Sequence, residues 1–170
     1  MITKLGDHRG KQLVFGHDRH LDAELPAYLE VLRGHGLPAR GSERKTPYYL
    51  ATAARVCRRV QGRTDRVGVL ICLTGIGMSI AANKFRGIYA ARCVTVEDAA
   101  SARVINNANV LCLAAQTGLA INQVILDTFL GTPYEGRRLE ELAAITLIEV
   151  ETQVPLVPVS RGKADSAKIA

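Results

Sequence analysis

Short apolar runs alternate along the chain with segments in which apolar residues recur at helical spacing. This alternation is typical of βαβ units, in which helices cover a parallel sheet. The run at 67–73, VGVLICL, is almost wholly apolar, as expected of a central strand that is buried on both faces. Strands are predicted at 12–16, 67–73, 88–93 and 109–114, with a weaker edge strand at 37–40. The predicted fold class is α/β, a single doubly wound, Rossmann-like domain with a mainly parallel sheet of about five strands flanked by helices.

Segments of helical period fill the intervals between these strands. Pro26 and Pro47 both fall at the start of such a segment, where a helix tolerates proline because the first-turn N–H has no partner inside the helix. Helices are predicted at 22–33, 47–60, 78–85, 97–104, 119–130 and 138–149. The fifth segment has apolar residues at spacings of three and four, which predicts one buried stripe. The members of this stripe are Ile121, Val124, Ile125, Thr128 and Phe129.

The end of the chain differs in composition from the rest. A length of 170 residues fits one compact domain, which we place at 1–152. The remaining stretch, 153–170, carries two prolines and then small polar residues. It is predicted to form an extended arm that either wraps a neighbouring subunit or ends as a disordered tail.

Composition narrows the class of protein. With 48% apolar and 22% charged residues, the chain has enough apolar surface to bury a core. No apolar run reaches the length of a membrane span or a signal peptide, so we expect a cytoplasmic protein without a membrane partner. The formal charge of +6 is scattered over the chain and only 5% of residues are aromatic. A solvated basic surface is therefore favoured over a nucleic-acid partner, and a mildly basic site for an anionic metabolite fits as well.

The cysteines give no sign of a metal or disulfide site. Cys57, Cys72, Cys93 and Cys112 stand far apart and form no CxxC pair, so we expect reduced thiols and no bound metal. Three of them are interpreted as small core residues. Cys72 differs because it ends the predicted central strand, directly before the turn TGIG and a helix. Ligands bind at such crossings, and backbone donors in the turn would favour the thiolate of Cys72, which could then act as a base.

A longer match now makes a resemblance visible. The segment that begins at Ile71, ICLTGIGMSIAANKFRGI, closely resembles ICGTGIGMSIAANKFKGI. The latter is a signature of the family that contains type B ribose-5-phosphate isomerase and the two subunits of galactose-6-phosphate isomerase. The similarity continues through VFGHDRH, NNANVLCLAAQTG and FLGTPYEGRR, and so covers residues 12–149.

The resemblance implies an aldose-ketose isomerase that acts on a small sugar phosphate, such as a pentose, tetrose or hexose phosphate. The family works through a cis-enediol without metal or cofactor. By this resemblance Cys72 is the catalytic acid/base, and Thr74 assists ring opening. The resemblance and the local pattern together suggest substrate-binding roles for Asp18, Arg19, Gly75, Gly77, Ser79, Asn106 and Arg138.

Several family positions are occupied by other residues in this chain. Arg19 occupies the position of the histidine that follows the family aspartate, with His17 and His20 as neighbours, and Ile105 occupies the position of the histidine that precedes Asn106. Isoleucine cannot transfer a proton. The arginine after the NVLALGA run of the family is Gln116, and its second C-terminal arginine is Leu142. The proton-transfer residue and the glycine turn are therefore kept, whereas ring opening and part of the phosphate clamp are not.

Two interpretations of these departures stay open. The chain is a homodimeric or tetrameric isomerase whose substrate is open-chain or carries its anionic group elsewhere, with Arg19, Arg137 and Arg138 forming a rearranged clamp. Alternatively, it is one subunit of a hetero-oligomer, like galactose-6-phosphate isomerase, and a paralog completes the site. Family members share their active sites between subunits, so both interpretations require an oligomer.

Overall fold

A four-stranded, all-parallel sheet forms the centre of the protein. The computed structural model describes residues 4–39 and 48–151. Within them the strand order is β1-β2-β4-β3, so the chain crosses over the sheet in both directions. This confirms the doubly wound α/β fold, with four strands in place of about five. The strands are β1 (Gln12–His17), β2 (Arg66–Cys72), β3 (Ala90–Cys93) and β4 (Val110–Ala114).

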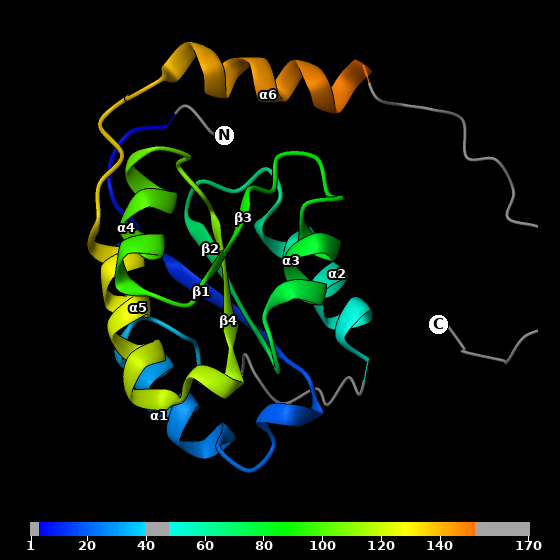
Figure 1. Ribbon diagram of the computed structural model, residues 1–170, viewed down its shortest axis with the longest axis vertical. Helices are drawn as coiled ribbons and strands as arrows, with labels where there is room; N and C mark the ends of the chain where they lie inside the picture. The colour runs from blue at the N-terminus through cyan, green and yellow to red at the C-terminus, as the bar shows by residue number, and fades with distance from the viewer. Residues whose placement is uncertain (1–3, 40–47, 152–170) are drawn as a thin grey trace, which may run out of the picture.

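Helices cover both faces of this sheet and one of its ends. Helices α1, α4 and α5 lie on one face, α2 and α3 lie on the other, and α6 crosses the amino ends of the strands (Figure 1). The bounds are α1 (Leu25–Gly34), α2 (Tyr49–Val60), α3 (Ile76–Ala82), α4 (Val96–Val104), α5 (Leu119–Gly131) and α6 (Leu139–Glu151), with short 3-10 turns η1 (Arg19–Leu21) and η2 (Ala115–Thr117). Every predicted helix is present with shifted ends. None of the helices in the described ranges is long and apolar enough to cross a membrane.

The weak edge strand predicted at 37–40 does not form over 37–39, and Arg40 lies outside the described residues. The backbone N–H of Leu37 donates instead to the carbonyl of Leu32, 3.0 Å away, and so caps the end of α1. Gly36 makes this reversal possible because its φ is +96°, in the left-handed region. Pro38 follows and has no N–H to give to a sheet. The predicted start of α2 at Pro47 and the arm at 153–170 also fall outside the described residues.

The buried stripe of α5 agrees only in part with the predicted one. Ile125 and Phe129 are buried as predicted, whereas Ile121 and Val124 are half exposed. The buried residues of α5 are Asn122, Ile125, Leu126, Phe129 and Leu130. Asn122 is polar, but its amide donates to the Tyr28 hydroxyl and to the Ala114 carbonyl, both at 2.8 Å. These bonds pair both N–H groups of the amide, whereas its buried Oδ1 has no hydrogen-bond partner in the described part of the chain. A polar residue thus occupies a core position that apolar periodicity alone does not identify.

Arg103 closes the amino end of the sheet from inside. Its side chain is fully buried, and its guanidinium donates to oxygens from three separate segments. Nη1 donates to Asn107 Oδ1 and to the Ala108 carbonyl at 2.7 Å each, Nη2 donates to the Gly6 carbonyl at 2.8 Å, and Nε donates to the Thr132 carbonyl at 3.3 Å. We call Arg103 and these four residues the amino-end network. It ties the start of the chain to the ends of α4 and α5.

Candidate active site

The parallel register brings Asp18 beside Cys72 at the carboxyl ends of two neighbouring strands. His17 of β1 pairs with Ile71 of β2, and the N–H of Asp18 donates to the Ile71 carbonyl at 3.2 Å. Cys72 is the last residue of β2 and pairs with Ala114 of β4 on its other side. Carboxyl ends of parallel strands are where α/β folds bind their ligands. The predicted proton-transfer residue therefore lies at the ligand-binding edge of the sheet.

Cys72 is distinct from the three cysteines interpreted as core residues. Cys57, Cys93 and Cys112 are 0% exposed, and Cys72 is 6% exposed. Burial raises the pKa of Cys57 and of Cys93 to about 12, and it raises the pKa of Cys112 as well. These three stay protonated thiols inside the protein, which confirms their assignment to the core. Cys72 also belongs to the buried cluster beneath α2 and α3, but it is the residue that directly precedes the turn at 73–77.

That turn, residues 73–77, carries backbone donors that the described part of the protein leaves open. Gly75 has φ +73°, and a Cβ there would lie 3.2 Å from the Leu113 carbonyl oxygen, so only glycine fits without strain. The Thr74 hydroxyl accepts from the Ile76 N–H at 3.3 Å. The N–H groups of Gly75 and Gly77 have no acceptor among the described residues. These two amides are available to an oxygen of a ligand.

The structure gives Gly77 a packing reason as well. A Cβ at Gly77 would come within 2.9 Å of the Tyr49 ring, so its absence allows α2 and α3 to pack closely. Ser79 is half-buried one turn further along α3, where its N–H donates to the Gly75 carbonyl at 3.1 Å. Sequence reasoning did not identify Arg92, whose Nε donates to the Thr74 carbonyl at 2.7 Å. Arg92 comes from β3, which no local motif links to the turn.

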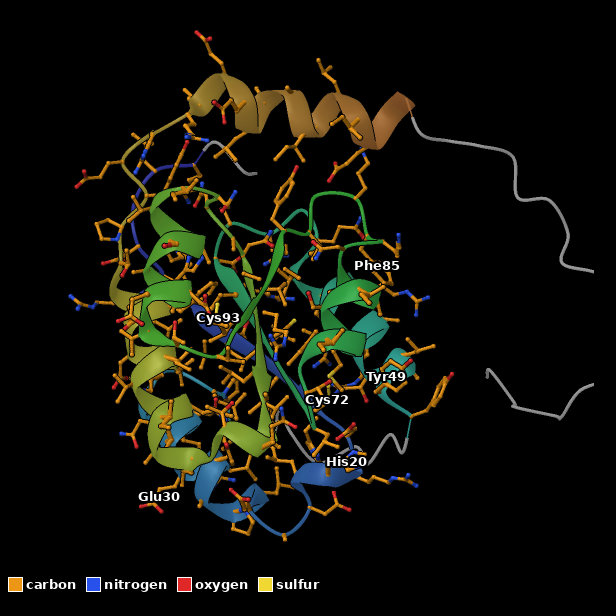
Figure 2. All side chains as sticks on the ribbon, viewed as in Figure 1. His20, Glu30, Tyr49, Cys72, Phe85 and Cys93 are labelled. Atoms are coloured by element: carbon orange, nitrogen blue, oxygen red, sulfur yellow. The ribbon has the colours of Figure 1, made fainter. Side chains whose placement is uncertain are left out.

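Asp18 is hydrogen-bonded to a histidine at the same carboxyl end of the sheet. It caps η1: its Oδ1 accepts from the backbone N–H of His20 at 3.0 Å, and its Oδ2 lies 3.1 Å from Nδ1 of the His20 ring. Asp18 is 7% exposed, whereas the His20 side chain is 37% exposed. His20 and Cys72 lie at the same end of the sheet (Figure 2). Arg19, which stands between Asp18 and His20, is exposed.

We call Asp18, His20, Cys72 and the turn 73–77 the carboxyl-end site. His20 is the member that the sequence did not single out. The available signal was an aspartate two residues before a histidine at a helix start, a spacing at which a carboxylate caps both backbone and ring.

Asn106 and Arg138 lie at the opposite end of the sheet. Asn106 directly follows α4, near the point where the Asn109 N–H donates to the Tyr89 carbonyl ahead of β3 and β4. Arg138 precedes α6, is exposed, and donates to Glu141 at 3.2 Å. The length of β4 separates this end from the carboxyl-end site by about 13 Å at the usual rise per residue. One chain therefore does not bring these two residues to Cys72.

A groove runs past Asn106 along the free edge of β3. It measures about 460 Å³, and Arg92, Asn106 and Ile145 of α6 are among its lining residues. The groove is open to the outside, so Asn106 is accessible to another molecule. Within the described ranges no group of three or more His, Cys, Asp or Glu side chains gathers as metal ligands do.

The residues that replace family groups are found in three different settings. Ile105 is half-buried at the end of α4. Leu142 is 2% exposed and packs in a small apolar cluster with Tyr134, so that position serves α6 packing. The backbone N–H of Gln116 donates to the Leu73 carbonyl at 3.3 Å, which places Gln116 beside the turn. Of the three, only Gln116 adjoins the carboxyl-end site.

Comparisons with known proteins match the chain to sugar-phosphate isomerases. The family model described as ribose/galactose isomerase matches residues 15–145. The chain is 40% identical over 148 residues to ribose-5-phosphate isomerase B of Escherichia coli K12, a match that covers 82% of this chain and 97% of the relative. It is 37% identical over 93 residues to D-erythrulose-4-phosphate isomerase of Pectobacterium atrosepticum, covering 54% and 61% of the two chains.

The fold is also found among solved structures. Type B ribose 5-phosphate isomerase of Leishmania infantum superimposes with a TM-score of 0.72 at 36% sequence identity. The superposition covers 83% of this chain and 97% of the other. The unmatched part of this chain is thus small.

Proposed function

Because this chain belongs to the ribose/galactose isomerase family, we propose that it interconverts the aldose and ketose forms of a sugar phosphate, with Cys72 as the group that carries the proton. The observation that supports this most is the place of Cys72. It ends the central strand and directly precedes the turn that carries two open backbone amides. A thiolate there removes the proton from C2 of the aldose and returns it to C1 of the enediol.

The turn stabilises the charge that develops in this step. When C2 loses its proton, negative charge moves onto the carbonyl oxygen at C1, and the amides of Gly75 and Gly77 are free to donate to it. Thr74 in the turn and half-buried Ser79 on α3 also carry hydroxyls. Asp18, already fixed by His20, has further lone pairs for sugar hydroxyls, and exposed Arg19 offers a guanidinium to the phosphate.

A second chain completes the site in this proposal. Asn106 and Arg138 are exposed at the amino end of the sheet, about 13 Å or more from Cys72 within one chain. A dimer that places the amino end of one chain over the carboxyl end of the other would bring both residues to the substrate. The open groove beside Asn106 leaves room for such an approach. The partner is a second copy of this chain or a paralog.

The main experiment follows C–H exchange in heavy water by NMR. When the protein is incubated with ribose 5-phosphate or erythrulose 4-phosphate, deuterium should replace the hydrogen on the sugar carbon next to the carbonyl. Cys72→Ala should abolish the exchange, because alanine fills the space but cannot carry a proton. The matched control is Cys93→Ala, another buried cysteine at the end of a strand, which should keep the exchange. Exchange that persists in Cys72→Ala refutes the assigned role.

Mixing two inactive variants tests the shared site. Cys72→Ala and Arg138→Ala each lack one half of the site, so each should be inactive alone. If the halves come from different chains, hybrid dimers contain one intact site, and activity should return to about a quarter of the wild-type value. No recovery after verified subunit exchange would place both residues in the same site of one chain. Activity that needs a paralog, even with the wild-type chain, would favour the heteromeric alternative.

A further inference from the structure

Two histidines, His17 and His20, lie close to Asp18 in the sequence. The His17 ring is buried and packed, whereas the His20 ring is partly exposed and has one nitrogen without a partner among the described residues. His17 is 8% exposed, its Nδ1 donates to the Asp18 carbonyl at 3.0 Å, and its ring stacks on Phe15. His20 is 37% exposed and is bound through Nδ1 to the Asp18 carboxylate. In the part of the chain that the structure describes, Nε2 of His20 has no hydrogen-bond partner.

The Asp18 contact selects the form of this imidazole. A carboxylate accepts but does not donate, so the neutral His20 ring carries its proton on Nδ1 and presents a lone pair at Nε2. A half-exposed ring that is fixed in one tautomer by a buried carboxylate is prepared to act as a general base. Its charged neighbours in the sequence include Arg19 and Asp22, and neither is bonded to Nε2 in the described ranges; Asp22 lies 3.9 Å from Nδ1 of His17 instead.

We propose that His20, oriented by Asp18, opens the ring of a cyclic sugar phosphate before Cys72 acts on the open chain. This inference rests on the proposed isomerase function and adds the group that Ile105 cannot supply. Asp18 is then a positioning residue for His20 as well as a contact of the sugar. The substrate class that follows includes furanose phosphates, not only sugars that are already open.

The step balances within the sugar. Nε2 takes the proton from the hydroxyl O1 at the anomeric carbon, and the O1 electrons form the C1=O1 bond. The bond from C1 to the ring oxygen O4 breaks, and its electron pair stays on O4. The imidazolium then returns the proton to O4, which becomes a hydroxyl. O1 and O4 are both bonded to C1, so a single nitrogen serves both without moving far.

The chain contains a second His–Asp pair that serves as a control. His35 Nε2 lies 2.8 Å from Asp127 Oδ1, and the His35 side chain is 32% exposed, close to the value for His20. His35 ends α1 near the start of β1, at the other end of the sheet from Cys72. Replacing His35 therefore removes the same chemical pair without touching the carboxyl-end site.

The test compares a ring-forming and an open-chain substrate. Ribose 5-phosphate closes a five-membered ring through O4, whereas erythrulose 4-phosphate carries its phosphate on O4 and stays open. His20→Gln should lower kcat/KM for ribose 5-phosphate by about 100-fold, within the range for loss of a general base. For erythrulose 4-phosphate the loss should be at least tenfold smaller. His35→Gln should match the wild-type protein on both sugars.

A second measurement separates ring opening from isomerisation. In Cys72→Ala, which cannot move the carbon-bound proton, exchange between the two anomers of ribose 5-phosphate should still be accelerated and visible by NMR exchange spectroscopy. Adding His20→Gln should return that exchange to the uncatalysed rate. Acceleration that persists in the double variant overturns the assignment of His20. An equal loss of kcat/KM on both sugars in His20→Gln overturns it as well. So does a wild-type protein that turns over erythrulose 4-phosphate but not ribose 5-phosphate. Absence of turnover of either sugar by the wild-type protein refutes the proposed function itself.

Discussion

The two ends of the sheet differ in whether their polar groups find hydrogen-bond partners within the chain. At the amino end, all three guanidinium nitrogens of Arg103 donate to protein oxygens at 2.7–3.3 Å, and the residue is fully buried. At the carboxyl end, the amides of Gly75 and Gly77 and Nε2 of His20 are unpaired within the described residues. Charged side chains are buried at both ends, and the guanidinium of Arg103 is saturated by the chain itself, whereas Nε of Arg66 at the start of β2 has no partner within the described residues.

This difference indicates which end is structural and which is reactive. A buried polar group that is fully satisfied fixes its neighbours and has no capacity left for a ligand. Open donors next to a thiol are costly for folding and become useful when a substrate oxygen fills them. The comparison predicts that substitutions in the carboxyl-end site change turnover, and that substitutions of the buried residues of the amino-end network change stability.

Cys72→Ala gives the largest expected effect. Turnover should fall by at least about 1,000-fold, because the acid/base of the reaction is lost. The free energy of unfolding should change by less than about 1.5 kcal/mol, since a small, not quite fully buried side chain is replaced by another small one. Activity assays and urea unfolding of the same preparation check both values. A stability loss larger than the activity loss would contradict a reactive carboxyl end.

Arg103→Met should show the reverse pattern. The loss of Arg103 removes a charged donor from the carbonyls of Gly6, Ala108 and Thr132. Gly6 keeps the N–H of Tyr134 and Ala108 keeps Nε2 of His8, so the unfolding free energy should fall by about 3 kcal/mol. The kcat per folded molecule should be unchanged, because Arg103 is not part of the carboxyl-end site. Arg58→Met, on an exposed face of α2, is the control and should cost little. A drop in kcat with unchanged stability would break the comparison.

The fold was predictable from sequence where burial is complete. Strand β2 is apolar at almost every position and was located to within one residue. The prediction was wrong where a backbone hydrogen bond decides the outcome, as for the Leu37 N–H that caps α1. On α5 the prediction was right for Ile125 and Phe129 and wrong for Ile121 and Val124, because two neighbouring registers of the helix show apolar spacing. There, the hydrogen bonds of Asn122 to Tyr28 and Ala114 select the buried register.

The site was predictable only where it is contiguous in sequence. Cys72, Thr74 and Gly75 follow one another in a motif, and Asp18 joins them through the strand register. Arg92 reaches the turn from β3, a contact that exists only in three dimensions. The separation of Asn106 and Arg138 from Cys72 likewise depends on the direction of α4 and α6 relative to the strands, which residue spacing does not give.

Gly75→Ala should produce an intermediate effect on both properties. A residue with a Cβ at φ +73° costs about 1–2 kcal/mol, and the Cβ would also lie 3.2 Å from the Leu113 carbonyl oxygen. The turn should shift, so turnover should fall as well, by roughly tenfold or more if one enediolate contact weakens. Gly10→Ala is the matched control, because Gly10 has φ +72° but nothing within 4 Å of its Cβ. Equal activity losses in the two variants would refute a special role for the turn.

His8 at the amino end makes the free energy of unfolding depend on pH, by a small amount and in a defined direction. Its Nε2–H donates to the Ala108 carbonyl and its Nδ1 accepts from the Lys11 ammonium. Burial, and then the charge of Arg103, lower the pKa of His8 from 6.5 to about 3. The native ring therefore stays neutral at a pH where the unfolded chain binds a proton.

Below pH 6.5 and above about 3, protonation of His8 favours the unfolded state. Its contribution to stability is complete above pH 6.5 and decreases as the pH falls toward 3, by about 1.4 kcal/mol per pH unit. In His8→Gln that part of the slope should vanish, so the difference between pH 6 and pH 5 should shrink by about this amount. Urea unfolding at a series of pH values measures it, with His35→Gln as the control for removing a histidine. If the unfolding free energy of His8→Gln falls with pH as steeply as that of the wild-type protein, the neutral, buried His8 ring is not the cause of the loss of stability in acid.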